Sequence, residues 1–231
     1  MHIYTKSSDA DIELIQQHTG TDNVTQLPNI GREGETFLHH IISQWDSLAE
    51  HTLFVQADVH NPREFYARIR QYFDPKQTGM LSLGFTGHVC SCDHGCGDQW
   101  GWRESSDVIS RIHDQVYNVS GPYTEYCTNI LLSYKGQFIV SSRRIRGIPR
   151  TAYVELQHAL ADKDSWAHQE DYLKGASDSL NAPAFGYTLE RLWNFIFQCS
   201  NVDIAWKCPS LLSGERIGGS IQDCQCFDTI S

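Results

Sequence analysis

Residues 24–56, VTQLPNIGREGETFLHHIISQWDSLAEHTLFVQ, decide the fold. The apolar and β-branched start at 24–27 predicts a first strand. Between 35 and 48 the apolar residues recur every three or four positions, which is the spacing of one face of a helix. The run 52–56 is short, aromatic or β-branched and polar at its end, as buried parallel strands are. This strand, helix and strand predict an α/β fold with a mostly parallel sheet.

The rest of the chain predicts further elements around this unit. Pro62 occupies the favoured first position of a second helix, which ends before Asp74-Pro75. Apolar spacing predicts three more helices near 108–116, 153–160 and 189–197, and a strand pair within 129–141 that turns at Lys135-Gly136. We expect a single α/β domain over residues 1–207, with a mixed, mostly parallel central sheet and flanking helices. An irregular, cysteine-containing tail over 208–231 packs on it.

Composition limits the compartment and the partners. The chain has 231 residues, of which 40% are hydrophobic, and can bury one substantial core. It has no apolar run near the roughly 18 residues that span a bilayer, and residues 1–6 lack the apolar stretch of a signal peptide. We therefore expect no membrane span and a cytoplasmic location. The formal net charge of −10 disfavours a nucleic-acid partner such as tRNA. Arg143, Arg144, Arg146 and Arg150 form either a local basic patch or a solvated strand end.

The cysteines point to a different compartment. There are eight, namely Cys90, Cys92, Cys96, Cys127, Cys199, Cys208, Cys224 and Cys226. They form disulfides in an oxidising compartment, and act as metal ligands or stay free thiols in a reducing one. The stretch from His88 to Cys96 alternates side chains that could bind zinc, although without the usual Cys-x-x-Cys spacing. We expect disulfides that cross-link this loop to the cysteines of the tail, with zinc and free thiols as the alternatives.

Two adjacent motifs carry a resemblance to a known family. The stretch from Leu27 to Glu33 reads LPNIGRE, and the stretch from Thr36 to Ile42 reads TFLHHII. Together they resemble a domain-of-unknown-function family found in fungi and bacteria. Agreement continues at Phe54–Asp58, Gln137–Ser141, Tyr187–Phe197, Cys208–Ser210 and Cys224–Cys226. The resemblance covers nearly the whole chain and implies relatives, but no reaction.

The step from Asn29 to Glu33 also resembles inverting glycosyltransferases of the GT-A type. In those enzymes a strand ends in Asn, and a turn led by Gly opens a helix beside the activated donor. The resemblance implies that Asn29, Gly31, Arg32, Glu33 and Gln56 bind the donor. A glycine turn lets the backbone approach a ligand, and free amides at a helix N-terminus attract a diphosphate. An ordinary strand-to-helix turn is the alternative explanation of Gly31.

The GT-A resemblance also implies a first strand that helps to hold the nucleotide base. The sequence begins after the position of that strand, so we expect the first strand to be missing. Either the start is misplaced, the chain is shortened, or this protein does not bind a nucleotide in the usual way.

The resemblance further implies a metal site and a general base. GT-A enzymes hold a divalent cation on an Asp-x-Asp after the helix, and here Asp58 and His60 follow Gln56 at that place. A carboxylate and an imidazole could share manganese or magnesium, and a polar strand end is the alternative. Glu190 is predicted at the head of the last helix, where Trp193 could raise its pKa for proton abstraction from an acceptor. Stabilisation of Glu190 by the helix dipole is the alternative.

Three functions remain open at this point. The first is a group transferase, most simply a glycosyltransferase, that uses a small-molecule or nucleotide-activated donor. The second is a transferase with a non-sugar donor, such as an activated acyl group or an aminoacyl-tRNA, in a natural-product pathway. The third is a non-enzymatic binding or structural domain. For a transferase, Arg32, Asp58, His60 and Glu190 should face one cleft, with Asp58 and Glu190 catalytic and with the turns at the carboxyl ends of neighbouring strands.

Overall fold

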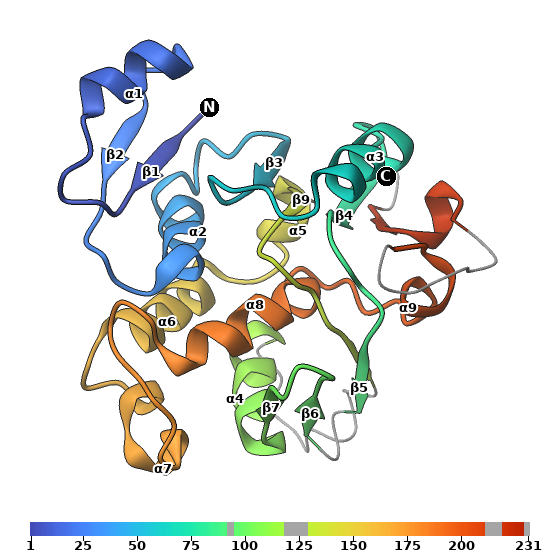
Figure 1. The fold of residues 1–231 in the computed structure, drawn as a ribbon. Helices are drawn as coiled ribbons and strands as arrows, with labels where there is room; N and C mark the ends of the chain where they lie inside the picture. Colours follow the sequence, from blue (N-terminus) through green and yellow to red (C-terminus); the bar gives the residue numbers. More distant parts are fainter. Residues whose placement is uncertain (92–94, 118–128, 211–218, 229–231) are drawn as a thin grey trace.

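The computed structural model describes residues 1–91, 95–117, 129–210 and 219–228. A four-stranded sheet lies near the centre of these residues, with strand order β10-β4-β9-β3 (Figure 1). Its strands are β3 (His51–Phe54), β4 (Thr78–Ser82), β9 (Phe138–Ser141) and β10 (Cys226–Phe227). The tail of the chain therefore supplies one edge of the sheet.

The strands of this sheet run antiparallel, whereas a mostly parallel sheet was expected. Each of its three described strand pairings is antiparallel, since β9 lies between β3 and β4 and runs opposite to both. All residues of β9 are buried, so its apolar run carries no period-2 pattern that would mark an antiparallel strand. The α/β class is confirmed, whereas the mostly parallel GT-A-like sheet is wrong.

A small N-terminal unit stands apart from the central sheet. Strand β1 (Ile3–Thr5) pairs in parallel with β2 (Val24–Gln26), and α1 (Ile12–Thr19) connects them. Asp11 caps the helix by accepting a hydrogen bond from the Leu14 amide. The strand predicted at 24–27 is thus present, but it belongs to this unit at the upper left of Figure 1 and not to the central sheet.

The predicted helices are present. They are α2 (Arg32–Ser43), α3 (Pro62–Tyr72), α4 (Ser106–Tyr117), α6 (Arg150–Ala161) and α8 (Ala184–Ile196). In Figure 1, α8 runs through the middle of the molecule, and it is buried along most of its length. Phe37 of α2 packs against Phe54, Phe138 and Trp193, with ring centres 5.0, 5.9 and 6.0 Å away. This aromatic cluster joins α2 and α8 to the sheet.

The predicted strand pair within 129–141 is only partly present. Strand β8 (Asn129–Leu131) pairs with β5 (Val89–Ser91), whereas β9 joins the central sheet, so the two strands do not pair with each other. The turn at Lys135-Gly136 is confirmed, with φ angles of +73° and +54°. The remaining elements are β6 (Cys96–Gly97), β7 (Arg103–Glu104), α5 (Ser142–Ile145), η3 (Trp166–His168), α7 (Glu170–Leu173), α9 (Asp203–Lys207) and η4 (Ile221–Asp223).

Disulfides hold the C-terminal segment in place. Cys199 pairs with Cys226 and Cys208 with Cys224, while Cys90 pairs with Cys96. Disulfide formation is therefore confirmed for these six residues, and zinc or free thiols are wrong for them. The expected cross-link between loop and tail is also wrong for them, because cysteine spacing does not determine which residues pair. Cys92 and Cys127 lie outside the described residues.

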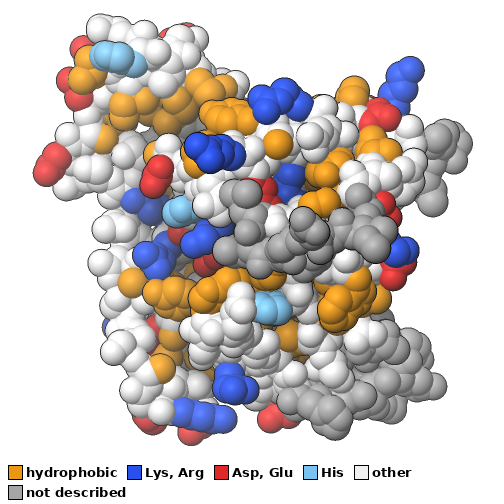
Figure 2. All heavy atoms as spheres, turned by 45° about the vertical axis from the view of Figure 1, so that its right-hand side comes forward, with side chains coloured by type: hydrophobic (Ala, Val, Ile, Leu, Met, Phe, Trp, Pro, Cys, Tyr) orange, Lys and Arg blue, Asp and Glu red, His pale blue; other side chains and the backbone are white. Residues whose placement is uncertain are grey.

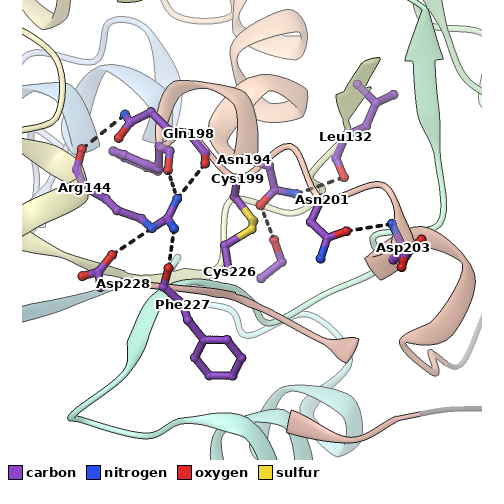
Figure 3. Close-up of a disulfide and its surroundings, with 12 residues drawn as sticks. Leu132, Arg144, Asn194, Gln198, Cys199, Asn201, Asp203, Cys226, Phe227 and Asp228 are labelled. Atoms are coloured by element: carbon purple, nitrogen blue, oxygen red, sulfur yellow. Dashed lines mark hydrogen bonds and ion pairs between the residues drawn. A yellow bond between two sulfur atoms is a disulfide. The ribbon is translucent and has the colours of Figure 1, made fainter. Parts of the chain in front are cut away.

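Arg144 reinforces the attachment of the tail beside the Cys199–Cys226 disulfide (Figure 3). Its guanidinium donates to the Asp228 carboxylate and to the carbonyl of Phe227 at 3.0 and 2.8 Å. It also donates to the carbonyls that follow α8, at Phe197 and Gln198. The arginine cluster predicted as a patch or a solvated strand end thus has one member largely buried in a structural role. No helix among the described residues is long and apolar enough to cross a membrane.

Candidate functional site

The turn that begins α2 has an unusual backbone. Gly31 has φ +66°, and a Cβ atom built on it would lie 2.4 Å from Cβ of Glu35. Arg32 follows with φ +50°, a region that costs free energy for a residue with a side chain. Strained backbone of this kind is found at functional sites when its surroundings enforce it.

Gly31 is predicted to be required for this turn. Gly31→Ala should lower the free energy of unfolding by about 2 kcal/mol, because the added methyl both opposes the positive φ and collides with Glu35. Urea denaturation measures the change. Gly20→Ala is the matched control, because Gly20 also has positive φ but a Cβ there would meet nothing within 4 Å. Equal losses in the two variants would contradict the close approach to Glu35.

Lys6 holds the turn in position from the neighbouring strand end. Its ammonium donates to the carbonyl of Ile30, to the carbonyl of Arg32 at 2.6 Å and to the Glu35 carboxylate at 2.8 Å. Glu35 also accepts from Gln157 of α6 at 2.9 Å. The charge of Lys6 is therefore neutralised within the protein, and this network fixes the strained turn to α6.

A pocket of about 340 Å³ opens beside the turn. Its lining is mostly polar and comes from β1, the start of α2, the segment after β3, and a residue that precedes α8. It consists of Tyr4, Lys6, Asn29, Arg32, Glu33, Thr36, Phe37, Val55, Gln56, Ala57 and Asn181. A second pocket of about 580 Å³ shares Lys6 and Asn29 with it. Basic and acidic side chains also gather beside a hollow in the left half of Figure 2.

Arg32 is the cation best placed for a ligand in this pocket. Its side chain is exposed, and Nη1 donates to the Tyr187 hydroxyl at 3.2 Å while the guanidinium lies 5.7 Å from the Tyr187 ring centre. Within the described part of the chain no carboxylate forms an ion pair with it. The planar guanidinium could therefore bind phosphate or carboxylate oxygens of a ligand in bidentate fashion.

The backbone of Lys135 connects the pocket to Glu190. Gln56 Nε2 donates to the Lys135 carbonyl at 3.2 Å, and the Lys135 amide donates to Glu190 Oε1 at 2.7 Å. The Glu190 side chain is 20% exposed, so its carboxylate can reach a ligand. Glu190 was predicted at the head of this helix. Because α8 begins at Ala184, Glu190 instead lies in the middle of it. Stabilisation by the N-terminal helix dipole therefore does not explain this residue.

The two predicted metal ligands lie beside the pocket but do not line it. Asp58 is exposed in the segment between β3 and α3, and His60 is half-buried there. The amide and carbonyl of His60 are both bonded to the Gln137 side chain. Over residues 1–91, 95–117, 129–210 and 219–228, no group of three or more His, Cys, Asp or Glu side chains could hold a metal ion.

The structure thus brings together most of the sequence-predicted residues. Asn29, Arg32, Glu33 and Gln56 line one pocket and Gly31 precedes its Arg32, whereas Glu190 does not line the pocket and is linked to Gln56 through the Lys135 backbone. The segments after β2 and β3 meet at the pocket although those strands belong to different sheets. The other seven lining residues were not predicted as site residues. Thr36, Phe37, Val55 and Ala57 lie in or next to predicted elements, and Tyr4, Lys6 and Asn181 come from segments without a recognisable motif.

Tyr4 also contacts a histidine with a strongly shifted pKa. The Tyr4 hydroxyl lies 2.9 Å from Nδ1 of His40 on α2. Burial, and to a smaller extent the nearby His2 and His39, lower the pKa of His40 to about 4. His40 is therefore neutral at physiological pH and can hydrogen-bond with Tyr4 at the rim of the pocket.

Comparison with known proteins identifies the family. The family model described as Protein of unknown function (DUF3431) matches residues 3–211, so the chain belongs to this family. The resemblance predicted from the two motifs is thereby confirmed. Neither the curated proteins nor the solved structures contain a match. The likeness to GT-A glycosyltransferases consequently rests on the sequence motifs alone.

Proposed function

We propose that this member of the DUF3431 family is a group transferase, most simply a glycosyltransferase, that binds an activated anionic donor in the pocket beside α2. The observation that carries the proposal is the meeting of Asn29, Arg32, Glu33 and Gln56 in one pocket. Amide and carboxylate groups suit the hydroxyls of a sugar, and an arginine without an internal carboxylate suits a phosphate. The strained turn at Gly31 and Arg32 supports a functional role for this pocket.

In this proposal Glu190 is the general base. The acceptor hydroxyl gives its proton to the Glu190 carboxylate, and the acceptor oxygen forms a bond to the anomeric carbon of the donor. The bond from that carbon to the phosphate oxygen breaks, and the phosphate leaves with the electron pair. Arg32 stabilises the negative charge that develops on the leaving phosphate. Glu190 is suited to the role because it is partly exposed and adjoins the pocket through Lys135.

A divalent cation would have Asp58 and His60 as its protein ligands. Manganese or magnesium bound there would take its remaining ligands from donor phosphates and water. Since neither residue lines the pocket itself, the cation would sit at its edge. If a chelator leaves the affinity for the donor unchanged, the cation has no part in donor binding.

The other candidate functions have less support. A tRNA-linked donor would have to approach a chain of net charge −10. A purely structural role does not explain the strained turn at Gly31. It also does not explain why Arg32 forms no ion pair with a carboxylate of the described residues. The six disulfide-bonded cysteines favour an oxidising compartment for whichever function applies, in place of the cytoplasm expected from the sequence.

A thermal-shift screen tests the proposal. The ligands are nucleotides, nucleotide sugars, an acyl-coenzyme A, tRNA and divalent cations, each with the wild-type protein. A ligand that binds only the native state raises the melting temperature. The proposal expects a higher melting temperature with at least one nucleotide sugar. A shift with acyl-coenzyme A or tRNA alone would indicate an acyl or aminoacyl donor in place of a nucleotide sugar. No shift with any of them would support a non-enzymatic domain.

A further inference from the structure

Trp100 is held with half of its surface in water at the tip of a short hairpin. The hairpin consists of β6 (Cys96–Gly97) and β7 (Arg103–Glu104), and Trp100 is 49% exposed. Gly101 follows with φ +87°, which allows the tight turn. A large exposed indole gives up hydrophobic burial, so a surface that presents one rigidly is suited to binding.

Asp98 makes this tip rigid. Its carboxylate accepts hydrogen bonds from the amides of Trp100 and Trp102 at 2.9 and 3.1 Å and forms an ion pair with Arg191 of α8 at 2.7 Å. Burial raises the pKa of Asp98, but Arg191 and these amides outweigh burial and hold the pKa below its ordinary value. The Cys90–Cys96 disulfide ties the base of the hairpin to β5. Trp100 is therefore fixed before any ligand arrives, which lowers the entropic cost of binding.

Three further rings support the exposed indole through T-shaped contacts. Tyr134 lies 4.8 Å from Trp100 between ring centres, His88 lies 5.5 Å away and Phe85 5.7 Å away. His88 Nδ1 also lies 2.8 Å from the Tyr134 hydroxyl. We call these four residues the Trp100 platform. Phe85 and Tyr134 are its buried members, while Trp100 and the half-buried His88 reach the surface.

The Trp100 platform adjoins the proposed catalytic carboxylate. Tyr134 directly precedes Lys135, whose amide bonds Glu190. Arg191, which follows Glu190, lies 5.3 Å from the Tyr134 ring centre, and its Nη1 is 4.0 Å from Glu190 Oε2. Lys135 also bonds Gln56 of the donor pocket. Glu190 thus lies between the donor pocket and the platform, which is the place where an acceptor must meet the donor.

We infer that the Trp100 platform binds the acceptor, and that the acceptor is an oligosaccharide with one pyranose ring stacked on Trp100. A sugar ring offers an apolar face to the indole, and its hydroxyls can bond the polar groups at the platform edge, His88 and Glu190. A protein partner fits less well, because the exposed part is one aromatic residue with polar neighbours and not a broad apolar patch. This inference rests on the proposed function.

Titration calorimetry with oligosaccharides tests the platform without any donor. The probes are tri- to pentasaccharides of glucose, mannose, galactose, xylose and N-acetylglucosamine. At least one should bind the wild type, and Trp100→Ala should weaken that binding about tenfold, since it removes the stacking surface. Trp206→Ala is the matched control, because Trp206 is 65% exposed on α9 away from the platform, and it should bind as the wild type does.

The outcomes separate this inference from the proposed function. Trp100→Phe should retain part of the affinity, since a smaller ring still stacks. Absence of binding by every oligosaccharide, or equal weakening by Trp100→Ala and Trp206→Ala, would overturn the platform. Oligosaccharide binding that depends on Trp100, in a protein that binds no nucleotide sugar, would support the platform and contradict the transferase.

Discussion

Glu190→Gln is expected to lower the rate of group transfer by about 10²- to 10⁴-fold, because it removes the proton acceptor. The amide oxygen of glutamine can still accept the Lys135 amide, so the fold and the pocket should persist. The rate is measured as release of the phosphate-bearing leaving group from the donor that the thermal-shift screen identifies. Donor affinity should remain unchanged, since the carboxylate acts on the acceptor and not on the donor.

Glu155→Gln is the matched control for this loss. Glu155 is an exposed carboxylate on α6, and the substitution changes the charge in the same way. Its transfer rate should equal that of the wild type. A Glu190→Gln rate within a few fold of the control would exclude Glu190 as the base, whereas a parallel loss of melting temperature would assign it a structural role.

Removal of the Cys199–Cys226 disulfide should produce the largest loss of stability. The two cysteines are 27 residues apart, but the Cys208–Cys224 disulfide already bridges 16 of these, so the loss of Cys199–Cys226 in Cys199→Ala/Cys226→Ala should cost about 3 kcal/mol of unfolding free energy. After this change Arg144 and the Cys208–Cys224 disulfide still join the tail to the segment after α8, and Arg144 lies directly beside the lost bridge (Figure 3). Guanidinium denaturation of the oxidised proteins measures the difference.

A second pair of cysteines controls for the chemistry of the substitution. Cys90 and Cys96 are only 6 residues apart, so Cys90→Ala/Cys96→Ala should cost about 0.5 kcal/mol less than the first double variant. If the two double variants are equally stable, constraint of the unfolded chain does not explain the effect. If reductant leaves the wild-type stability unchanged, noncovalent contacts such as those of β10, Gln225 and Arg144 suffice to hold the tail.

The helices could be predicted because their signal is local. The apolar spacing in 35–48 and 189–197 reflects which face is buried, and α2 and α8 follow it. The sheet could not be predicted in the same way. Strand β4 contains Gly79 and ends in polar residues, and Gly79 is required because a Cβ there would lie 2.2 Å from the Arg144 side chain. Which strands become neighbours depends on such distant contacts.

The candidate site could likewise be predicted only in part. Asn29, Arg32 and Gln56 could be predicted because a strand-to-helix turn and a strand end are visible in the sequence. Trp100 could not, because its hairpin has strands of two residues, and its position depends on the ion pair between Asp98 and Arg191, 93 residues apart. The Lys135 backbone link between Gln56 and Glu190 is likewise invisible in the sequence.

The most direct test of the donor pocket compares two arginine variants by titration calorimetry. The titrant is the nucleotide sugar that most raises the melting temperature of the wild type. Arg32→Gln should weaken its binding by about 10- to 100-fold, because a charge-assisted hydrogen bond to phosphate is lost. Arg70→Gln, at an exposed arginine on α3 outside the pocket, makes the same charge change and should bind as the wild type does. Equal affinity of the two variants for the nucleotide sugar would contradict the account.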